Sequence, residues 1–388
     1  MTNLGIYSLS GYGDMINDTG RMAAYFKVLK TIISSDKVVL DIGTGTGILS
    51  LLACHLGAKK VYAIEPADAI WVAQEIARVN GYSDRIEFIQ DISTNITLPK
   101  LVDVIISDLR GVLPLFQRHI PSLIDARQRF LKSNGVLVPQ QDMLWVTVVE
   151  ATEMYQDFAS PWTDQPYGFD MTAATRYVTN TWKKAQSVTP EMFLVEPQCW
   201  ATLDYRTIMN PNVTAELEWL TERTGLAHGL CLWFDATLIE GVGFSNAPSQ
   251  PDLIYGKAFF PFSHPINLEK NDVINLKLKA NLVGDDYIWR WATKVLQQGN
   301  AKDIKASFNQ STFFATPISP KQLQKQSDQF VPQINNTAKV DKLALNLMEN
   351  ALPLGTIAQR LTEQFSDRFP TWKSALTYVG ELSQRYSD

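Results

Sequence analysis

The sequence predicts an α/β domain with a doubly wound parallel sheet, followed by an antiparallel β-barrel domain and a small helical C-terminal module. Three patterns support this prediction: strands alternating with helices to about residue 140, period-two alternation to about 315, and helical spacing of apolar residues beyond. We therefore expect domains at 1–140, 141–315 and 316–388. A chain of 388 residues suits two domains and a small appendage.

Short β-rich runs alternate with helical patterns in the first part. The runs are VVLDI (38–42), KVYAIE (60–65), RIEFIQD (85–91), VDVIISD (102–108) and GVLVP (135–139), and the helical patterns are ILSLLACHLG (48–57) and AIWVAQEIARVNG (69–81). The runs are almost continuously apolar, which is typical of strands in a parallel sheet covered by helices on both faces.

The second and third parts have different textures. CWATLDY (199–205), GLCLWFDATL (229–238) and DVINLKLKANLV (272–283) alternate apolar and polar residues without intervening helices, which predicts an antiparallel barrel or sandwich. Beyond residue 316, three helical patterns predict a small helix-turn-helix-like module, with Thr356 as a candidate N-cap of its second helix.

Charge and cysteine content exclude several classes of protein. A net charge of −5 provides no basic surface for double-stranded nucleic acid, so we expect no nucleic-acid partner. The three cysteines lack any CxxC or Cys/His grouping, so we expect no disulfide framework, no metal site and a cytoplasmic location. The start of the chain lacks the pattern of a secretion signal, and no apolar run approaches 18 residues, so we expect no membrane partner.

The glycine-rich stretch VVLDIGTGTGILSLLAC (38–54) indicates a ligand site. An apolar strand leads to Asp41, and a helix follows the glycines. Glycines are needed between them because the strand-to-helix turn is tight and a ligand must approach the backbone closely. A dinucleotide fingerprint needs GxGxxG, and the sixth position is Ile48 or Ser50 in the two possible registers. The form DxGxGxG is typical of S-adenosylmethionine (SAM) binding, so a Rossmann-like SAM-binding domain is predicted. The candidate cofactor-binding residues of this turn are Asp41, Gly43, Thr44, Gly45 and Gly47.

Two acidic residues end the next strands. Glu65 is placed to accept hydrogen bonds from both ribose hydroxyls, and Asp91 is placed to meet the adenine edge. With the glycine turn they predict one site at the carboxyl edge of the sheet. The alternative is that the glycines only mark a turn and the acids face solvent.

The span from about residue 7 to 295 resembles the protein arginine methyltransferases, which have a SAM-binding domain, a β-barrel and a dimerisation arm. YGDMINDTGRMAAY (12–25) is similar to that family's N-terminal helix. The resemblance implies that Arg21 meets the SAM carboxylate, that Tyr12 also binds the cofactor, and that Met15 lines the active site. A surface arginine on an amphipathic helix is the alternative for Arg21.

Two further stretches extend the resemblance. LKSNGVLVPQ (131–140) matches the run into the family's last strand, and WTDQPYGFDM (162–171) is similar to the arm that reaches a second subunit. The aromatic residues of this loop favour contact with a partner, so we expect a homodimer through the arm near 152–200. Packing of the loop on its own barrel is the alternative.

The acceptor loop SDLRGVLPLFQ (107–117) departs from the family's pattern. Two glutamates nine residues apart hold the guanidinium in that family, and the matching positions here are Asp108 and Gln117. An amide cannot make the charge-assisted bidentate contact, and Arg110 is expected to repel an arginine substrate. Asp108, Gln117 and Met15 are the candidate catalytic residues, with Asp108 as a base or orienting acceptor or, alternatively, only a loop cap. The family's Thr-His-Trp triplet is replaced by the residues at 254–256, of which Tyr255 takes the place of the histidine.

The leading functional hypothesis is a SAM-dependent methyltransferase of this architecture that acts on a peptide, protein or small metabolite, and not on a conventionally held arginine. The first alternative is a true protein arginine methyltransferase that uses Asp108. The second is a non-catalytic SAM-binding or scaffolding protein. The C-terminal module is similar to small PqqD-like domains, which bind leader peptides as an added strand, or it is a plain structural cap.

Overall fold

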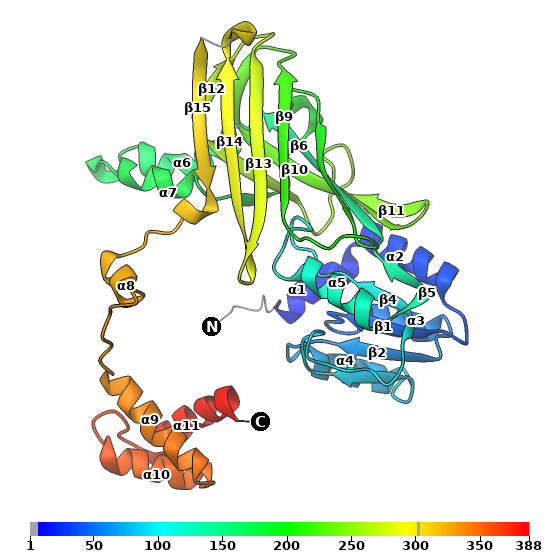
Figure 1. Cartoon of the computed structure of the whole chain (residues 1–388), viewed down its shortest axis with the longest axis vertical. Helices are drawn as coiled ribbons and strands as arrows, with labels where there is room; N and C mark the ends of the chain where they lie inside the picture. Colours follow the sequence, from blue (N-terminus) through cyan, green and yellow to red (C-terminus); the bar gives the residue numbers. More distant parts are fainter. Residues whose placement is uncertain (1–6, 301–302, 388) are drawn as a thin grey trace. The chain divides into compact units, whose positions relative to one another are not determined.

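The computed structural model of the chain describes residues 7–300 and 303–387 (Figure 1). They form two compact units, one ending at Pro317 and the other beginning at Ile318. In the part of the chain that the structure describes, no helix combines the length and apolar character needed to cross a bilayer.

The larger unit begins with a five-stranded parallel sheet in the order β3-β2-β1-β4-β5. Its strands are β1 (Val38–Ile42), β2 (Lys60–Ile64), β3 (Ile86–Ile89), β4 (Val102–Ser107) and β5 (Leu131–Val138). Its helices are α1 (Leu9–Asn17), α2 (Thr19–Ile32), α3 (Ile48–His55), α4 (Ala69–Val79) and α5 (His119–Arg129). The predicted parallel α/β domain is confirmed.

Alternate residues of the strands face two apolar cores. Val39 of β1 belongs to the same core as Tyr25 and Leu29 of α2, whereas its neighbour Leu40 belongs to a core with Ile120 of α5. Since side chains alternate along a strand, both faces of the sheet are apolar and both are covered by helices. This is the doubly wound arrangement that the sequence predicts.

The N-terminal segment forms two helices, although residues 12–25 resemble one helix in the related family. Asp18 ends α1 and caps α2, because its Oδ1 accepts a hydrogen bond from the backbone N–H of Arg21 at 3.0 Å. Its Oδ2 accepts from the backbone N–H of Ile254 at 2.8 Å. The break therefore anchors the start of α2 to the β-rich domain.

The rest of the larger unit has two antiparallel sheets, in the orders β7-β12-β10-β6-β8, with β11 on β10, and β15-β14-β13-β9 (Figure 1). The strands are β6 (Gln141–Val149), β7 (Lys183–Ala185), β8 (Gln198–Asp204), β9 (Val213–Leu220), β10 (Gly225–Ile239), β11 (Val242–Ser245), β12 (Lys257–Leu268), β13 (Val273–Val283), β14 (Asp286–Leu296) and β15 (Ile304–Ser311). Phe260 of the first sheet and Trp289 and Trp291 of the second share one core. The predicted antiparallel domain is confirmed.

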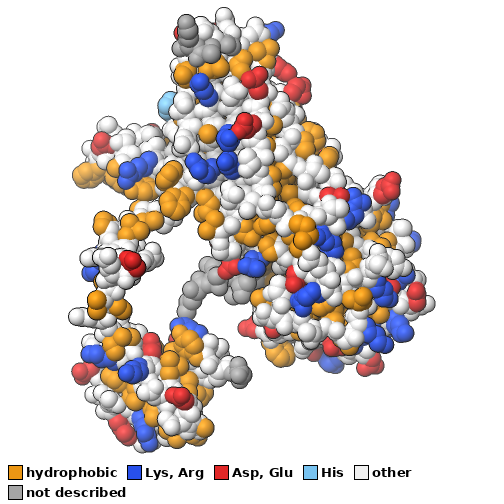
Figure 2. Space-filling model, in the orientation of Figure 1, with side chains coloured by type: hydrophobic (Ala, Val, Ile, Leu, Met, Phe, Trp, Pro, Cys, Tyr) orange, Lys and Arg blue, Asp and Glu red, His pale blue; other side chains and the backbone are white. Residues whose placement is uncertain are grey.

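A helical arm lies between β6 and β8 in the chain. It contains α6 (Thr152–Thr163) and α7 (Thr175–Val178), and α6 packs through Phe158 against Phe259 of β12. Beyond α6, Tyr167 is 99% exposed and Phe169 is 67% exposed, while Trp162 is half-buried. Figure 2 shows apolar side chains gathered on this arm. Dimerisation through the arm stays a prediction.

The smaller unit consists of α8 (Pro320–Lys325), α9 (Asn336–Glu349), α10 (Leu354–Gln364) and α11 (Trp372–Tyr386). Val340, Ile357, Leu361 and Val379 are buried in the core of the last three helices, which confirms the predicted helices. The N-cap prediction for Thr356 is wrong. This residue lies inside α10, whose N-cap position is occupied by Pro353 without a side-chain hydrogen bond.

Candidate active site

The glycine turn after β1 is held from inside by Asp41. Its side chain is buried, and Oδ2 accepts hydrogen bonds from the hydroxyls of Thr44 and Ser50, each at 2.7 Å. Burial raises the pKa of Asp41, because the charged form loses its hydration. Asp41, Thr44 and Ser50 therefore fix the shape of the turn by hydrogen bonds in the interior.

The glycines of the turn adopt conformations that other residues rarely reach. Gly43, Gly45 and Gly47 have φ values of +73°, +55° and +88°. A Cβ atom at Gly45 would lie 2.5 Å from Cε1 of Tyr12, which places this α1 residue directly over the turn. The backbone is therefore closely covered by Tyr12 here, and the cofactor-binding role of Tyr12 stays a prediction.

Glu65 follows β2 and faces the same turn. Its Oε2 accepts the backbone N–H of Gly45 at 3.0 Å, and Oε1 accepts that of Ala67 at 2.9 Å. Burial raises the pKa of Glu65. Burial also raises the pKa of Tyr12 to about 12, with the charge of Glu65 as the second cause. Each carboxylate oxygen has two lone pairs, so Glu65 retains acceptor capacity for a pair of hydroxyls.

Asp91 lies just beyond β3 and is half-buried. Its Oδ1 accepts the backbone N–H of Ile92 at 2.7 Å and the amide of Asn95 at 3.0 Å. The turn, Glu65 and Asp91 thus follow three adjacent parallel strands, at the edge where α/β sheets bind ligands. A glycine turn beside a buried carboxylate that retains acceptor capacity is compatible with an adenosine-type cofactor, and the binding roles of these residues stay predictions.

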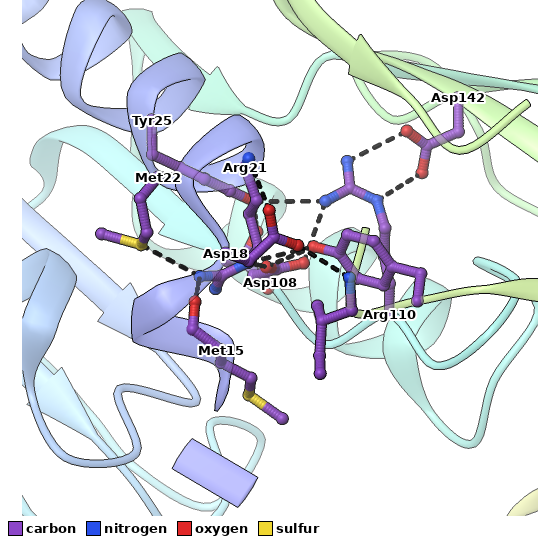
Figure 3. A network of polar contacts seen from close by, with 11 residues as sticks. Met15, Asp18, Arg21, Met22, Tyr25, Asp108, Arg110 and Asp142 are labelled. Carbon is purple, nitrogen blue, oxygen red and sulfur yellow. Dashed lines mark hydrogen bonds and ion pairs between the residues drawn. The ribbon is translucent and has the colours of Figure 1, made fainter. Parts of the chain in front are cut away.

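A buried network of ion pairs lies next to the turn and joins α2, the loop after β4 and β6 (Figure 3). Arg21 of α2 pairs with Asp108 after β4, Asp108 pairs with Arg110, and Arg110 pairs with Asp142 of β6. Each of the four side chains in this network is less than a tenth exposed. Two cations and two anions alternate, so the network is balanced in charge.

Asp108 has donors on both of its carboxylate oxygens. Oδ2 accepts from Nε of Arg21 and from the hydroxyl of Tyr255, both at 2.6 Å, and Oδ1 accepts from Nη1 of Arg110 at 3.0 Å. Burial raises the pKa of Asp108, but the charges of Arg21 and Arg110 outweigh burial and hold the pKa below its usual value. These contacts argue against Asp108 as a proton acceptor.

Arg110 is turned toward the β-rich domain. Its Nε and Nη2 donate to the two oxygens of Asp142 at 2.8 and 2.9 Å, a bidentate pair with both side chains fully buried. The expectation that Arg110 repels a cationic substrate through its own charge needs correction, because Asp142 matches that charge. Arg110 also donates a hydrogen bond to Oδ1 of Asp108, so this oxygen is already paired.

The side chains of two predicted site residues, Gln117 and Met15, make no contact with this network. Gln117 is half-buried with φ +41°, and within the described residues its amide has no hydrogen bond. The backbone oxygen of Met15 accepts from Nη1 of Arg21 at 3.1 Å, while Figure 3 shows its side chain leading away from the ion pairs. The structure therefore brings Asp108 and Arg21 together but does not pair Asp108 with Gln117.

Sequence reasoning missed Asp142 and Tyr205, whose hydroxyl donates to Oδ2 of Asp142 at 2.5 Å. A signal for Asp142 exists in β6. Position 142 is in phase with Leu144, Val146 and Val148, all buried, so an acid there points inward. An inward acid on a strand needs a buried partner, which Arg110 supplies.

Two histidines of the β-rich domain make structural contacts. Nδ1 of His228 accepts the backbone N–H of Ala151 at 3.1 Å, and His264 stacks edge-on against Phe308. Among residues 7–300 and 303–387, no group of three or more metal-binding side chains is close enough to hold an ion.

Comparisons with known proteins agree with this architecture. The profile "Ribosomal protein L11 methyltransferase (PrmA)" matches residues 18–159, and "Arginine methyltransferase oligomerization subdomain" matches residues 140–294. Protein arginine N-methyltransferase 2 of Mus musculus is 31% identical over 278 residues, covering 68% of this chain and 62% of the mouse protein. Probable protein arginine N-methyltransferase 1.2 of Arabidopsis thaliana is 31% identical over 61% of this chain and 66% of its own length. The chain thus spans slightly less than two thirds of these relatives.

Solved structures give the same fold. The open conformation of Arabidopsis thaliana protein arginine methyltransferase 10 matches with a TM-score of 0.68 and 25% identity, over 78% of this chain and 97% of that one. A Trypanosoma brucei PRMT1 enzyme-prozyme heterotetrameric complex with AdoHcy has a TM-score of 0.71 at 22% identity, over 80% and 98% of the two chains. Both profile matches end before the C-terminal unit, whose PqqD-like interpretation stays a prediction.

Proposed function

We propose that this chain, which belongs to the protein arginine methyltransferase family, is a SAM-dependent methyltransferase that acts on a peptide, protein or small metabolite. The nucleophile, on this proposal, is not a conventionally held arginine. The cofactor half is supported by the glycine turn, which Glu65 contacts through the backbone N–H of Gly45, and by the methyltransferase profile that spans it. The acceptor half of the proposal rests on the hydrogen bonds that both carboxylate oxygens of Asp108 already accept.

The cofactor residues have separate tasks in this proposal. The backbone from Gly43 to Gly47 would face the cofactor, Glu65 would accept the ribose hydroxyls, and Asp91 would meet the adenine. Arg21 would hold the carboxylate, because a guanidinium is a forked donor that remains charged when buried. When bound, SAM supplies a methyl group made electrophilic by its sulfonium. The chain's own contribution is then placement of the two reactants.

The observation that carries the acceptor proposal is that three donors already surround Asp108. A guanidinium needs carboxylate oxygens free to receive its forked N–H groups. Here two of the three donors are themselves guanidinium groups, and the network has no unmatched negative charge. In the network as it stands without cofactor, a further buried cation would have no counter-charge, which is strongly unfavourable. A neutral nucleophile suits this site better.

Calorimetry with S-adenosylhomocysteine, the demethylated product, tests the cofactor half. We expect binding by the wild type and a marked loss in Glu65→Gln, which removes the charge that the ribose hydroxyls meet. Glu87→Gln is the matched control, because Glu87 lies on β3 and is half exposed in a surface pair with Lys60. Absence of binding by the wild type would refute the proposal.

A true arginine methyltransferase is the second candidate, since the relatives carry that activity in their names. It requires Asp108 to leave Arg110 or Arg21 and to receive the substrate. Methyl transfer from radiolabelled SAM to arginine-rich peptides separates the two candidates. Strong arginine labelling that Asp108→Asn abolishes would favour this second candidate over our proposal.

A further inference from the structure

The outer face of the sheet β15-β14-β13-β9 carries a cluster of cationic side chains. Alternate residues of β13 and β14 are buried in the core, so the residues between them point outward. Four of these outward residues are cations: Lys277 and Lys279 on β13, and Arg290 and Lys294 on β14. Figure 2 shows blue side chains over these strands. A chain with a net charge of −5 therefore has a local positive surface on this sheet.

The register of β13 and β14 places two of the cations against each other. Lys279 lies directly opposite Arg290, and like charges in this position destabilise a sheet. Lys277 forms an ion pair with Glu216 of β9. Among residues 7–300 and 303–387, no ion pair involves the other three cations of the cluster. The fold gains no stability from this arrangement, which favours a binding role for the cluster.

A shallow depression of about 250 Å³ hollows the same face. Its lining includes Lys277 and Lys294, the amide of Asn275 and the hydroxyl of Ser307. The small side chain of Ala292, directly opposite Lys277, leaves room between the longer side chains. Within the described part of the chain, the side chains of Asn275 and Ser307 form no hydrogen bond with another residue. They are therefore available to the amide groups of a bound peptide.

We infer that this face binds an extended acidic segment of a partner protein, with carboxylates at alternate positions. The cations occupy three successive outward rows of the sheet, which are two residues and so ~6.7 Å apart. Alternate side chains of an extended peptide have the same spacing, so each carboxylate would meet one row. Arg290 offers a forked donor, and the lysines offer point charges. This binding role goes beyond the proposed activity and does not depend on it.

The acids beside the cluster decide the class of partner. Glu216 and Glu218 of β9 point outward beside the cations of β13 and confine the positive charge to a strip over β13 and β14. A nucleic-acid duplex carries a charge every ~1.7 Å along its axis, so its phosphates would also meet these acids. The separate carboxylates of a peptide can lie over the strip alone. Charge complementarity therefore favours an acidic peptide.

A variant without the opposed charges separates binding from a structural role. Lys279→Gln combined with Arg290→Gln removes both charges and retains polar side chains. Because the two cations repel each other, we expect the thermal midpoint of the larger unit to be unchanged or higher. The matched control is Lys27→Gln combined with Lys30→Gln, which removes two exposed charges from α2. A loss of stability in the first variant alone would assign the cluster to the fold and overturn the inference.

The binding experiment uses the full chain and the fluorescence anisotropy of a labelled peptide in which Glu alternates with Ser. We expect binding that weakens as salt rises, an affinity about fivefold lower in the Lys279→Gln and Arg290→Gln variant, and an unchanged affinity in the control. A peptide with Gln in place of Glu should not bind. Absence of binding to the Glu peptide, equal losses in the two variants, or tighter binding of a single-stranded oligonucleotide of equal charge would overturn the inference.

Discussion

Replacing Asp142 by leucine tests the buried ion-pair network in depth. The substitution removes both charged hydrogen bonds to Arg110, at 2.8 and 2.9 Å, and the acceptor of the Tyr205 hydroxyl. Arg110 then keeps Asp108 and the hydroxyl of Tyr25 at 3.2 Å, so its charge is only partly unmatched. Breaking a buried pair costs about 3–5 kcal/mol, and we expect the lower end, ~3 kcal/mol, because Asp108 remains.

The matched variant removes both charges as a pair. Arg110→Met combined with Asp142→Leu leaves no unpaired ion, and replacing a whole buried pair by apolar residues is often nearly neutral. We therefore expect the double variant to be more stable than either single variant, with strong coupling in the double-mutant cycle. The transition of the larger unit is followed by calorimetry and urea unfolding. Glu75→Gln, which breaks the exposed pair with Arg78, is the control and should change little. Additive losses, or a stable Asp142→Leu variant, would refute the reasoning.

Three other predictions concern the glycine turn after β1, the buried His119 and the helical arm. Gly45→Ala should abolish S-adenosylhomocysteine binding, because the new Cβ would lie 2.5 Å from the Tyr12 ring. Gly241→Ala is the control and should retain binding, because Gly241 also has a positive φ, +72°, but nothing lies within 4 Å of its Cβ position. Equal effects of the two substitutions would contradict the role of the glycine turn in cofactor binding. Since the pKa of His119 falls from 6.5 to about 3 on folding, unfolding takes up a proton between these values, so the free energy of unfolding should decrease as pH falls from about 6.5 toward 3. His119→Asn should lose that part of the pH dependence, and an unchanged profile would show that the ring is not buried neutral. Tyr167→Ser with Phe169→Ser should give monomers in sedimentation velocity if the arm forms the dimer, and an unchanged mass would exclude this interface.

The periodic elements and the glycine turn could be predicted because their signals are local. Val39 and Leu40 show the two apolar faces of β1, and the turn needs only the spacing of Gly43, Gly45 and Gly47. Glu65 could be found as well, since the carboxyl ends of neighbouring parallel strands meet at one edge. In each case the residues that specify the feature lie within one strand and the turn after it.

The acceptor site could not be read in the same way, because its contacts join distant parts of the chain. Arg110 is 32 positions from Asp142, which in turn is 63 positions from Tyr205. The pairing of Arg110 with Asp142 depends on how β6 packs against the acceptor loop. No spacing of residues in the sequence predicts that packing. The inward phase of Asp142 on β6 marks a buried acid but does not identify its partner.

Mass spectrometry of the methylated product tests the central claim most directly. The full chain is incubated with SAM and with peptides that differ only in a central Arg, Asn, Gln or Ser, and the modified atom is mapped by fragmentation. We predict methylation at a neutral nitrogen or oxygen, with the arginine peptide unmodified. Methylation confined to the arginine side chain, and lost in Asp108→Asn, would contradict the account.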